Sequence, residues 1–205
     1  DLITATEAFA LNGNAAAAGA IARNGATTLA GNLTGGSIAL GATTLTGNTS
    51  LDTSAANGAI KVASVNGATG GGQSLAIKAG TGSVSLGNAG ATTRLGAVSD
   101  ASKTTLTGST YNANSFLFGG DVTLTSADTT LNTTQSAGAA GDITFQGDLF
   151  GTTDGSQSLT LIAGPGTCAA SANADILLQN AGTTAVNLNN LTVSGDDFTA
   201  LTVDL

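Results

Sequence analysis

The sequence predicts an all-β protein wound as a parallel β-helix (β-solenoid), and three observations support this prediction. Apolar residues alternate with polar residues over segments of two to five residues, which is the pattern of half-buried strands. Asn-Gly pairs and glycine-rich stretches, which favour tight turns, separate these segments. Residues 73–82 return in similar form as residues 157–166, which indicates an internal repeat with a fixed offset.

The composition disfavours several other classes of protein. Charged residues make up 9% of the chain, against about 25% in an average globular domain. With 30 Gly, 1 Pro and no strict glycine period, both collagen and proline-rich disorder are disfavoured. Thr, Ser, Asn and Gly favour strands and tight turns over helices. Much of the 41% hydrophobic content is alanine, so we expect a narrow core that extends along a long axis.

Residues 1–37 are expected to form a lead-in or cap, or to be preceding rungs of the same winding. Within them, residues 1–6 alternate and predict a first strand. Residues 14–22 include four consecutive alanines, which have good helix propensity. An alanine-rich strand fits the same residues equally well, so both interpretations stay open.

The repeat divides the remaining chain into two predicted units, residues 38–121 and residues 122–205. Coils of roughly 20 residues would stack about 4.8 Å apart, so that each backbone amide pairs with the next coil. Extending the alignment outward matches Gly58 with Gly141. Near its centre, Leu75 and Leu159 should occupy equivalent layers of one winding.

An insertion distinguishes the second unit from the first. Residues 167–174 have no counterpart in the first unit, and insertions between coils lie in loops on one face. A corner bulge of small residues is one interpretation, and a binding loop is the other. The insertion contains Cys168, the single cysteine of the chain, so no intramolecular disulfide is expected.

A β-sandwich filament subunit is the alternative fold. Short strands at a spacing of about 8–12 residues also suit a sandwich or a barrel. A sandwich of this length would be expected to have more aromatic core residues than six Phe, one Tyr and no Trp. It would also leave the internal repeat unexplained.

Charge disfavours nucleic acid and anionic lipid as partners. The net charge is -8, and all five cations precede Thr104, whereas only acids follow it. This asymmetry favours end-to-end self-association, although a Debye length of about 8 Å keeps the effect weak. No apolar run is long enough for a membrane span and no leader pattern is present, so we expect no membrane insertion. The alternation continues to the last residues, which predicts a mature fragment or a piece of a longer protein.

Several segments resemble the repeats of filamentous-haemagglutinin-like exoproteins. They are Gly-Asp-Ile-Thr-Phe at 141–145, Gln-Ser-Leu-Thr-Leu at 157–161, Ala-Gly-Pro-Gly-Thr at 163–167 and Gly-Asp-Val-Thr-Leu-Thr-Ser at 120–126. The similarity covers residues 38–205. It implies a right-handed parallel β-helix outside a Gram-negative-type cell, exported by two-partner or autotransporter secretion and used for adhesion or surface structure. The amino-terminal secretion motif of that family is absent.

The residues that carry enzyme chemistry are scarce. The chain has no His, and Glu7 is its only glutamate. Most aspartates lie at turns, where Asp is favoured by local side-chain hydrogen bonds. A carbohydrate-active β-helix enzyme is the third functional hypothesis, because glycoside hydrolysis needs two positioned carboxylates; its candidates are Asp142, Asp148 and Asp154. We otherwise predict no catalytic, cofactor-binding or metal-binding residues and no cofactor.

Metal and glycan signals are weak. Gly119–Gly120–Asp121 does not recur at the nine-residue spacing of a calcium-binding repeat, and Cys168 has no His or second Cys with which to bind zinc. Asn-x-Ser/Thr triplets begin at Asn32, Asn48, Asn132 and Asn190. In Thr-Leu-Thr triplets we expect Leu to point inward and both Thr outward. These triplets are intermittent, so they do not predict an ice-binding face.

Together these observations predict a non-enzymatic, extracellular structural or adhesive β-solenoid segment of a bacterial surface protein. The alternative is a self-polymerising extracellular filament subunit, because uncapped strand edges template further pairing. The ligand, host surface or glycan that such a protein binds cannot be named from its residues.

Overall fold

A computed structural model describes residues 3–5, 8–134, 141–163, 175–181, 188–194 and 197–203. In these residues the chain forms twenty-one strands and no helix, and every strand pairing is parallel. The prediction of an all-β protein with parallel strands is therefore confirmed. The β-sandwich alternative is wrong, because consecutive strands of a sandwich pair antiparallel.

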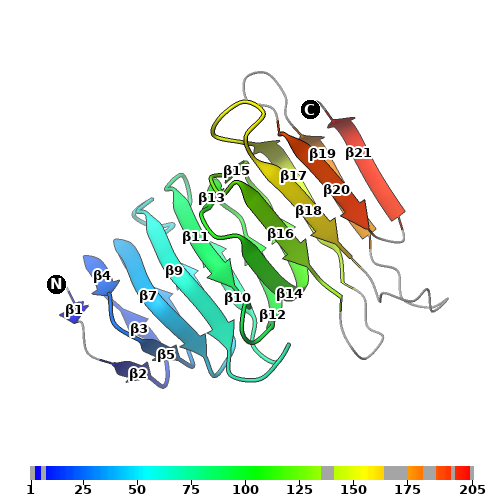
Figure 1. Cartoon of the computed structure of the whole chain (residues 1–205). Helices are drawn as coiled ribbons and strands as arrows, with labels where there is room; N and C mark the ends of the chain where they lie inside the picture. Colours follow the sequence, from blue (N-terminus) through cyan, green and yellow to red (C-terminus); the bar gives the residue numbers. More distant parts are fainter. Residues whose placement is uncertain are drawn as a thin grey trace.

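The strands pair in three series, which we call columns A, B and C, and several long strands pass from one column into the next (Figure 1). Column A contains β1 (Ile3–Ala5), β4 (Ala20–Arg23), the first parts of β7 (Ser37–Leu45), β9 (Ile60–Gly67) and β11 (Val84–Ala89), then β13 (Thr104–Leu106), β15 (Val122–Leu124) and the last parts of β17 (Ile143–Phe150), β19 (Asp175–Ala181) and β21 (Asp197–Val203). Column B contains β2 (Phe9–Leu11), β5 (Thr27–Leu29), the second parts of β7, β9 and β11, the start of β14 (Thr110–Phe118), β16 (Asp128–Asn132), β18 (Ser158–Ile162) and β20 (Asn190–Ser194). Column C contains β3 (Ala15–Ala16), β6 (Leu33–Thr34), β8 (Thr49–Asp52), β10 (Leu75–Lys78), β12 (Leu95–Asp100), the rest of β14 and the first parts of β17, β19 and β21.

The chain visits columns A, B and C in that order and then returns to column A. We call one such visit to all three columns a circuit. Ile21 and Ile38 are register partners on consecutive circuits, and so are Phe145 and Leu178, but the chain between the second pair is nearly twice as long. Circuit length is therefore not constant, and a coil of roughly 20 residues describes only the shorter circuits.

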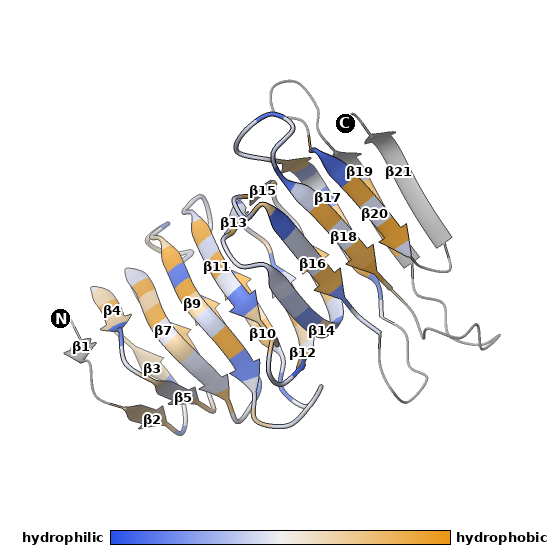
Figure 2. Cartoon of the chain, viewed as in Figure 1, coloured by the Kyte–Doolittle hydropathy of each residue, from blue (hydrophilic) through white to orange (hydrophobic). Residues whose placement is uncertain are grey.

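The inward-facing side chains of successive circuits stack on one another and form a thin core. In column A the buried register partners Ile38, Ile60 and Val84 are each 1% exposed. In column C, Phe118 and Phe145 are register partners. The centroids of their rings lie 5.1 Å apart, and the ring planes are inclined by 18°. Figure 2 shows hydrophobic and hydrophilic residues alternating along β9. The interior is thus filled mainly by Leu, Ile, Val and Phe, with some buried polar residues among them.

The alanine-rich segment adopts the extended alternative of the two that its sequence allows. Residues 15–16 form β3 and residues 20–23 form β4, so the helical interpretation of residues 14–22 is wrong. Ile21 is 4% exposed and pairs with Ile38, which shows that pairing and burial override the helix propensity of alanine. Residues 3–34 contribute β1 to β6 to the same three columns as the rest of the chain.

The residues that the sequence repeat aligns do not occupy equivalent layers, so that prediction is wrong. Leu75 lies in column C, between Thr49 and Val98. Leu159 lies in column B, between Thr129 and Leu191. Because circuit length varies, the offset of the repeat does not correspond to a whole number of circuits. Pairing also continues across the expected boundary between residues 121 and 122, through β13–β15 and β14–β16.

One type of hydrogen bond nevertheless recurs at the two glycines that the repeat aligns, Gly58 and Gly141. The Thr53 hydroxyl donates to the Gly58 carbonyl at 2.6 Å, and the Thr133 hydroxyl donates to the Gly141 carbonyl at the same distance. The first corner leads from column C to column A, and the second leads from column B to column C. The same kind of hydrogen bond, from a threonine hydroxyl to a glycine carbonyl, thus occurs at two different corners.

Candidate functional site

Most asparagines at the corners contact the backbone of the chain. The Asn32 Oδ1 accepts a hydrogen bond from the Ser50 amide, and the Asn48 Oδ1 accepts one from the Ser74 amide, each at 2.9 Å. Both bonds join neighbouring circuits. The Asn132 Oδ1 instead accepts from the nearby Thr134 amide at 2.7 Å. Three of the four asparagines in Asn-x-Ser/Thr triplets therefore have a structural role, and Asn190 is an exposed residue at the start of β20.

The three candidate catalytic aspartates lead into three different columns. Asp142 precedes the column C part of β17, whereas Asp148 pairs with Asn180 in column A. Asp154 lies in the turn before β18 of column B. The Asp148 amide donates to Asp121 Oδ1 at 3.1 Å, and the Asp121 carboxylate lies 4.0 Å from the exposed Lys103 ammonium. This arrangement does not favour a pair of carboxylates that flank one substrate bond.

Cys168 and the insertion of residues 167–174 lie outside the described residues.

The other predicted features can be compared with the described residues. Among the residues that the structure describes, no three His, Cys, Asp or Glu side chains gather as metal ligands. In this same part of the chain no helix is long and apolar enough to cross a membrane. In the Thr-Leu-Thr triplets Leu45, Leu106 and Leu124 are fully buried, which confirms their predicted inward direction.

Asp100 is a carboxylate inside the core. It ends β12, is 1% exposed and takes the register position between Ile77 and Phe118. Its Oδ1 accepts a hydrogen bond from the Ser102 amide at 2.8 Å, and its Oδ2 accepts one from the Thr104 hydroxyl. Burial raises the pKa of Asp100 to about 6, although these hydrogen bonds act in the opposite direction.

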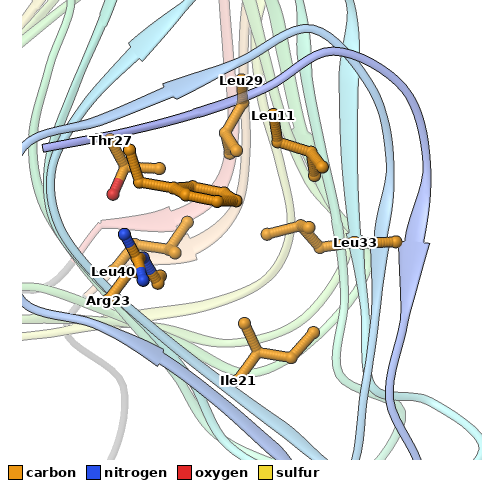
Figure 3. Close-up of a pocket in the computed structure, with 9 residues that line it drawn as sticks. Leu11, Ile21, Arg23, Thr27, Leu29, Leu33 and Leu40 are labelled. Carbon is orange, nitrogen blue, oxygen red and sulfur yellow. The ribbon is translucent and has the colours of Figure 1, made fainter. Parts of the chain in front are cut away.

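Arg23 is a second inward-facing charged residue, in an early circuit. It is 7% exposed and takes the position that Leu40 occupies in the next circuit. Its guanidinium carbon lies 4.1 Å from the centroid of the Phe9 ring, which is a cation–π contact. Figure 3 shows Arg23 beside Leu40, where both side chains line a cavity of about 40 Å³ with Leu33 and other apolar residues. A cavity of this size is a packing feature and not a ligand site.

The alternation of the sequence could have located both buried charges. Asp100 follows the inward-facing Val98 by two residues, and Arg23 follows the inward-facing Ile21 by two. In a strand, residues two apart face the same side of the sheet. Because sequence reasoning treated aspartates as turn residues, it missed Asp100.

The outer face of column C carries a hollow of about 260 Å³, which we call the column C hollow. Its lining includes four small residues, Ala76, Ser99, Ala101 and Gly119, which we call its floor, and also Ile77 and Asp100. Three residues with longer side chains also line it: Lys78 from β10, Leu117 from β14 and Gln146 from β17. Its volume is just below the roughly 300–1,000 Å³ that is typical of small-molecule pockets.

No protein-family model matches the chain, and neither a curated protein nor a solved structure matches it.

Proposed function

We propose that the chain is a segment of a right-handed parallel β-solenoid in an extracellular bacterial surface protein, where it has a structural and adhesive role and no enzymatic one. The observation that carries this proposal is the continuous parallel pairing in three columns. Crossovers between parallel strands of one sheet are right-handed in about 98% of cases, which supports the proposed hand. The resemblance of residues 38–205 to filamentous-haemagglutinin-like repeats supports the surface location.

Stacked circuits suit a protein that spans distance. Each circuit advances the winding by about 4.8 Å, the spacing of neighbouring strands. The core is held by contacts between adjacent circuits, so the length of such a winding can grow without widening it. Polar, mostly uncharged side chains such as Thr105 and Thr123 cover the outside and form register pairs there.

The experiment combines shape with location. Small-angle scattering of the purified chain should give the distance distribution of a monomeric rod. Antibodies raised against the chain should label intact cells of its source without permeabilisation. A compact globular particle would contradict the solenoid, and labelling that requires permeabilisation would contradict the surface role.

A specific observation favours a filament subunit as a second candidate function. Among the described residues, β1, β2 and β3 pair on one side only, with β4, β5 and β6. Phe9, the first residue of β2, has a side chain that is 38% exposed. Strand edges of this kind pair with further strands. Electron microscopy of the purified chain at increasing concentration separates long fibres, expected for a filament subunit, from single rods.

A further inference from the structure

The column C hollow combines a polar side and an apolar side. Leu117 is 41% exposed, which is unusual among the large apolar residues that the structure describes, and it lines the hollow together with the small residues Ala76 and Ala101. Lys78, Ser99 and Gln146 bring an ammonium group, a hydroxyl and an amide to the same hollow. A ligand that fits must therefore present both carbon-bound hydrogens and hydrogen-bonding groups.

The polar groups of the hollow are available to a ligand. The side chains of Ser99 and Gln146 make no hydrogen bond within the described part of the chain. Between them they offer both donors and acceptors, whereas Lys78 offers donors only. Gln146 lies near the floor, because its Oε1 is 3.6 Å from the position that a Cβ on Gly119 would take.

Charged residues of both signs lie at the hollow, because Lys78 and Asp100 both line it. Asp52 is the register partner of Lys78 on the preceding circuit. Hydrogen bonds from Ser54, with a smaller contribution from the Lys78 charge, lower the pKa of Asp52, so its carboxylate is ionised at neutral pH. Lys78 thus has the Asp52 carboxylate on the neighbouring strand, and Asp100 itself lines the hollow, which favours a neutral ligand over an anionic one.

We propose that the column C hollow binds one neutral hexose unit of a glycan. A hexose presents a face of C–H groups, which would lie against Leu117 and Ala101, and hydroxyl edges, which would reach Lys78, Ser99 and Gln146. The hollow of about 260 Å³ is smaller than the roughly 300–1,000 Å³ of drug-sized sites, so it suits a single sugar unit. This inference rests on the proposed adhesive function and gives it a partner class.

The test is a titration of the ¹⁵N-labelled full chain with the methyl glycosides of glucose, galactose and mannose. We expect at least one of them to shift the amide resonances of Ser99, Leu117, Gly119 and Gln146 saturably. Gln146→Ala and Leu117→Ala should each weaken that binding by about 2- to 10-fold, the effect of one hydrogen bond or a small apolar contact.

A filling variant and its control make the test specific. Ser99→Leu places a large side chain on the floor and should abolish the shifts, whereas Ser85→Leu, at an outward position of column A, should leave them unchanged. The hexose site is wrong if no glycoside gives saturable shifts, if Ser99→Leu binds like the unaltered chain, or if glucuronate binds better than the neutral sugars. Small-angle scattering separates the two proposals. If the chain is a rod that binds no hexose, only the proposed hexose site is wrong. If the chain is a globular particle, the proposed solenoid is wrong.

Discussion

Asp100 shows what one inward-facing residue does to a stacked core. Its folded-state pKa of about 6 lies above the ordinary value of 3.8, so the folded chain holds the proton more tightly than the unfolded chain. The resulting stability is fully present below pH 3.8 and is lost as the pH rises through about 6. A difference of about two pKa units corresponds to roughly 3 kcal/mol at most.

Asp100→Asn should therefore raise the free energy of unfolding at pH 7, by up to about 3 kcal/mol, and should flatten its pH dependence between pH 4 and 6. The amide keeps an oxygen for the Ser102 N–H and turns its NH₂ toward the Thr104 hydroxyl, which can accept. The measurement is urea unfolding across this pH range.

Asp52→Asn is the matched control, because Asp52 also accepts from a serine two residues later but is outside the core. Its pKa is lowered and not raised, so its contribution is lost as the pH falls, which is the opposite direction. A neutral-pH stability of Asp100→Asn below that of the unaltered chain would show that the buried charge is needed for the fold.

Phe118 tests the other extreme, an inward aromatic residue. It is fully buried and stacks on Phe145 and Phe116. Phe118→Ala should lower the free energy of unfolding by about 3–5 kcal/mol, because it removes a large side chain and leaves a cavity. The adjacent Leu117→Ala, on the outer face, should change it by no more than about 0.5 kcal/mol. Equal effects of the two substitutions in urea unfolding would contradict the assigned inward and outward faces.

At the scale of elements, the stacking of the strands depends on how closely the backbones of neighbouring circuits approach at the corners. A Cβ on Gly58 would lie 1.6 Å from the Gly36 carbonyl oxygen, and one on Gly141 would lie 1.5 Å from the Asn114 carbonyl oxygen. In both cases the backbone of the previous circuit passes directly beside the glycine. Glycine is needed there for close approach and not for a left-handed conformation.

Gly58→Ala and Gly141→Ala should each destabilise the fold by about 1–3 kcal/mol or more, since backbone must shift to admit the methyl group. Gly70→Ala is the control, because a Cβ there has nothing within 4 Å. Thermal unfolding monitored by circular dichroism measures all three. A Gly58→Ala variant as stable as Gly70→Ala would mean that the backbones at Gly36 and Gly58 are not in contact at this corner.

The strands could be predicted from the sequence, whereas their columns could not. Alternation places Ile60, Val62 and Leu86 inward correctly, because residues two apart in a strand share a face. The register of circuits depends on the length of the corners, and doubling a loop costs only about 0.6 kcal/mol, so corner length varies freely. The similarity of residues 73–82 to residues 157–166 therefore records a strand and turn, not a whole number of circuits.

The column C hollow could not have been foreseen for the same reason. Lys78, Leu117 and Gln146 are far apart in the sequence and come together only through the pairing of β10, β12, β14 and β17. Small residues at the floor carry no signal by themselves in a chain with 30 Gly and many Ala. Asp100, by contrast, follows directly from the alternation of β12.

At the scale of the whole molecule, sequence order becomes position along an axis (Figure 1). Because each circuit pairs with the one before it, the five cations lie in the earlier circuits, and those acids after Thr104 that the structure describes lie in the later ones. The parallel pairing between circuits thus determines the core, the corners, the hollow and this charge distribution.

Disulfide formation between outward positions measures that pairing directly. Thr130 and Thr160 are register partners in column B, although they are far apart in the sequence. Thr144 is closer to Thr160 in sequence but lies in column C. In a Cys168→Ser background, the Thr130→Cys/Thr160→Cys pair should oxidise to an intramolecular disulfide, because adjacent parallel strands place Cα atoms within the roughly 4.4–6.8 Å that the bond requires. The Thr144→Cys/Thr160→Cys pair should stay reduced; efficient oxidation of this pair, with none of the first, would contradict the stacked circuits.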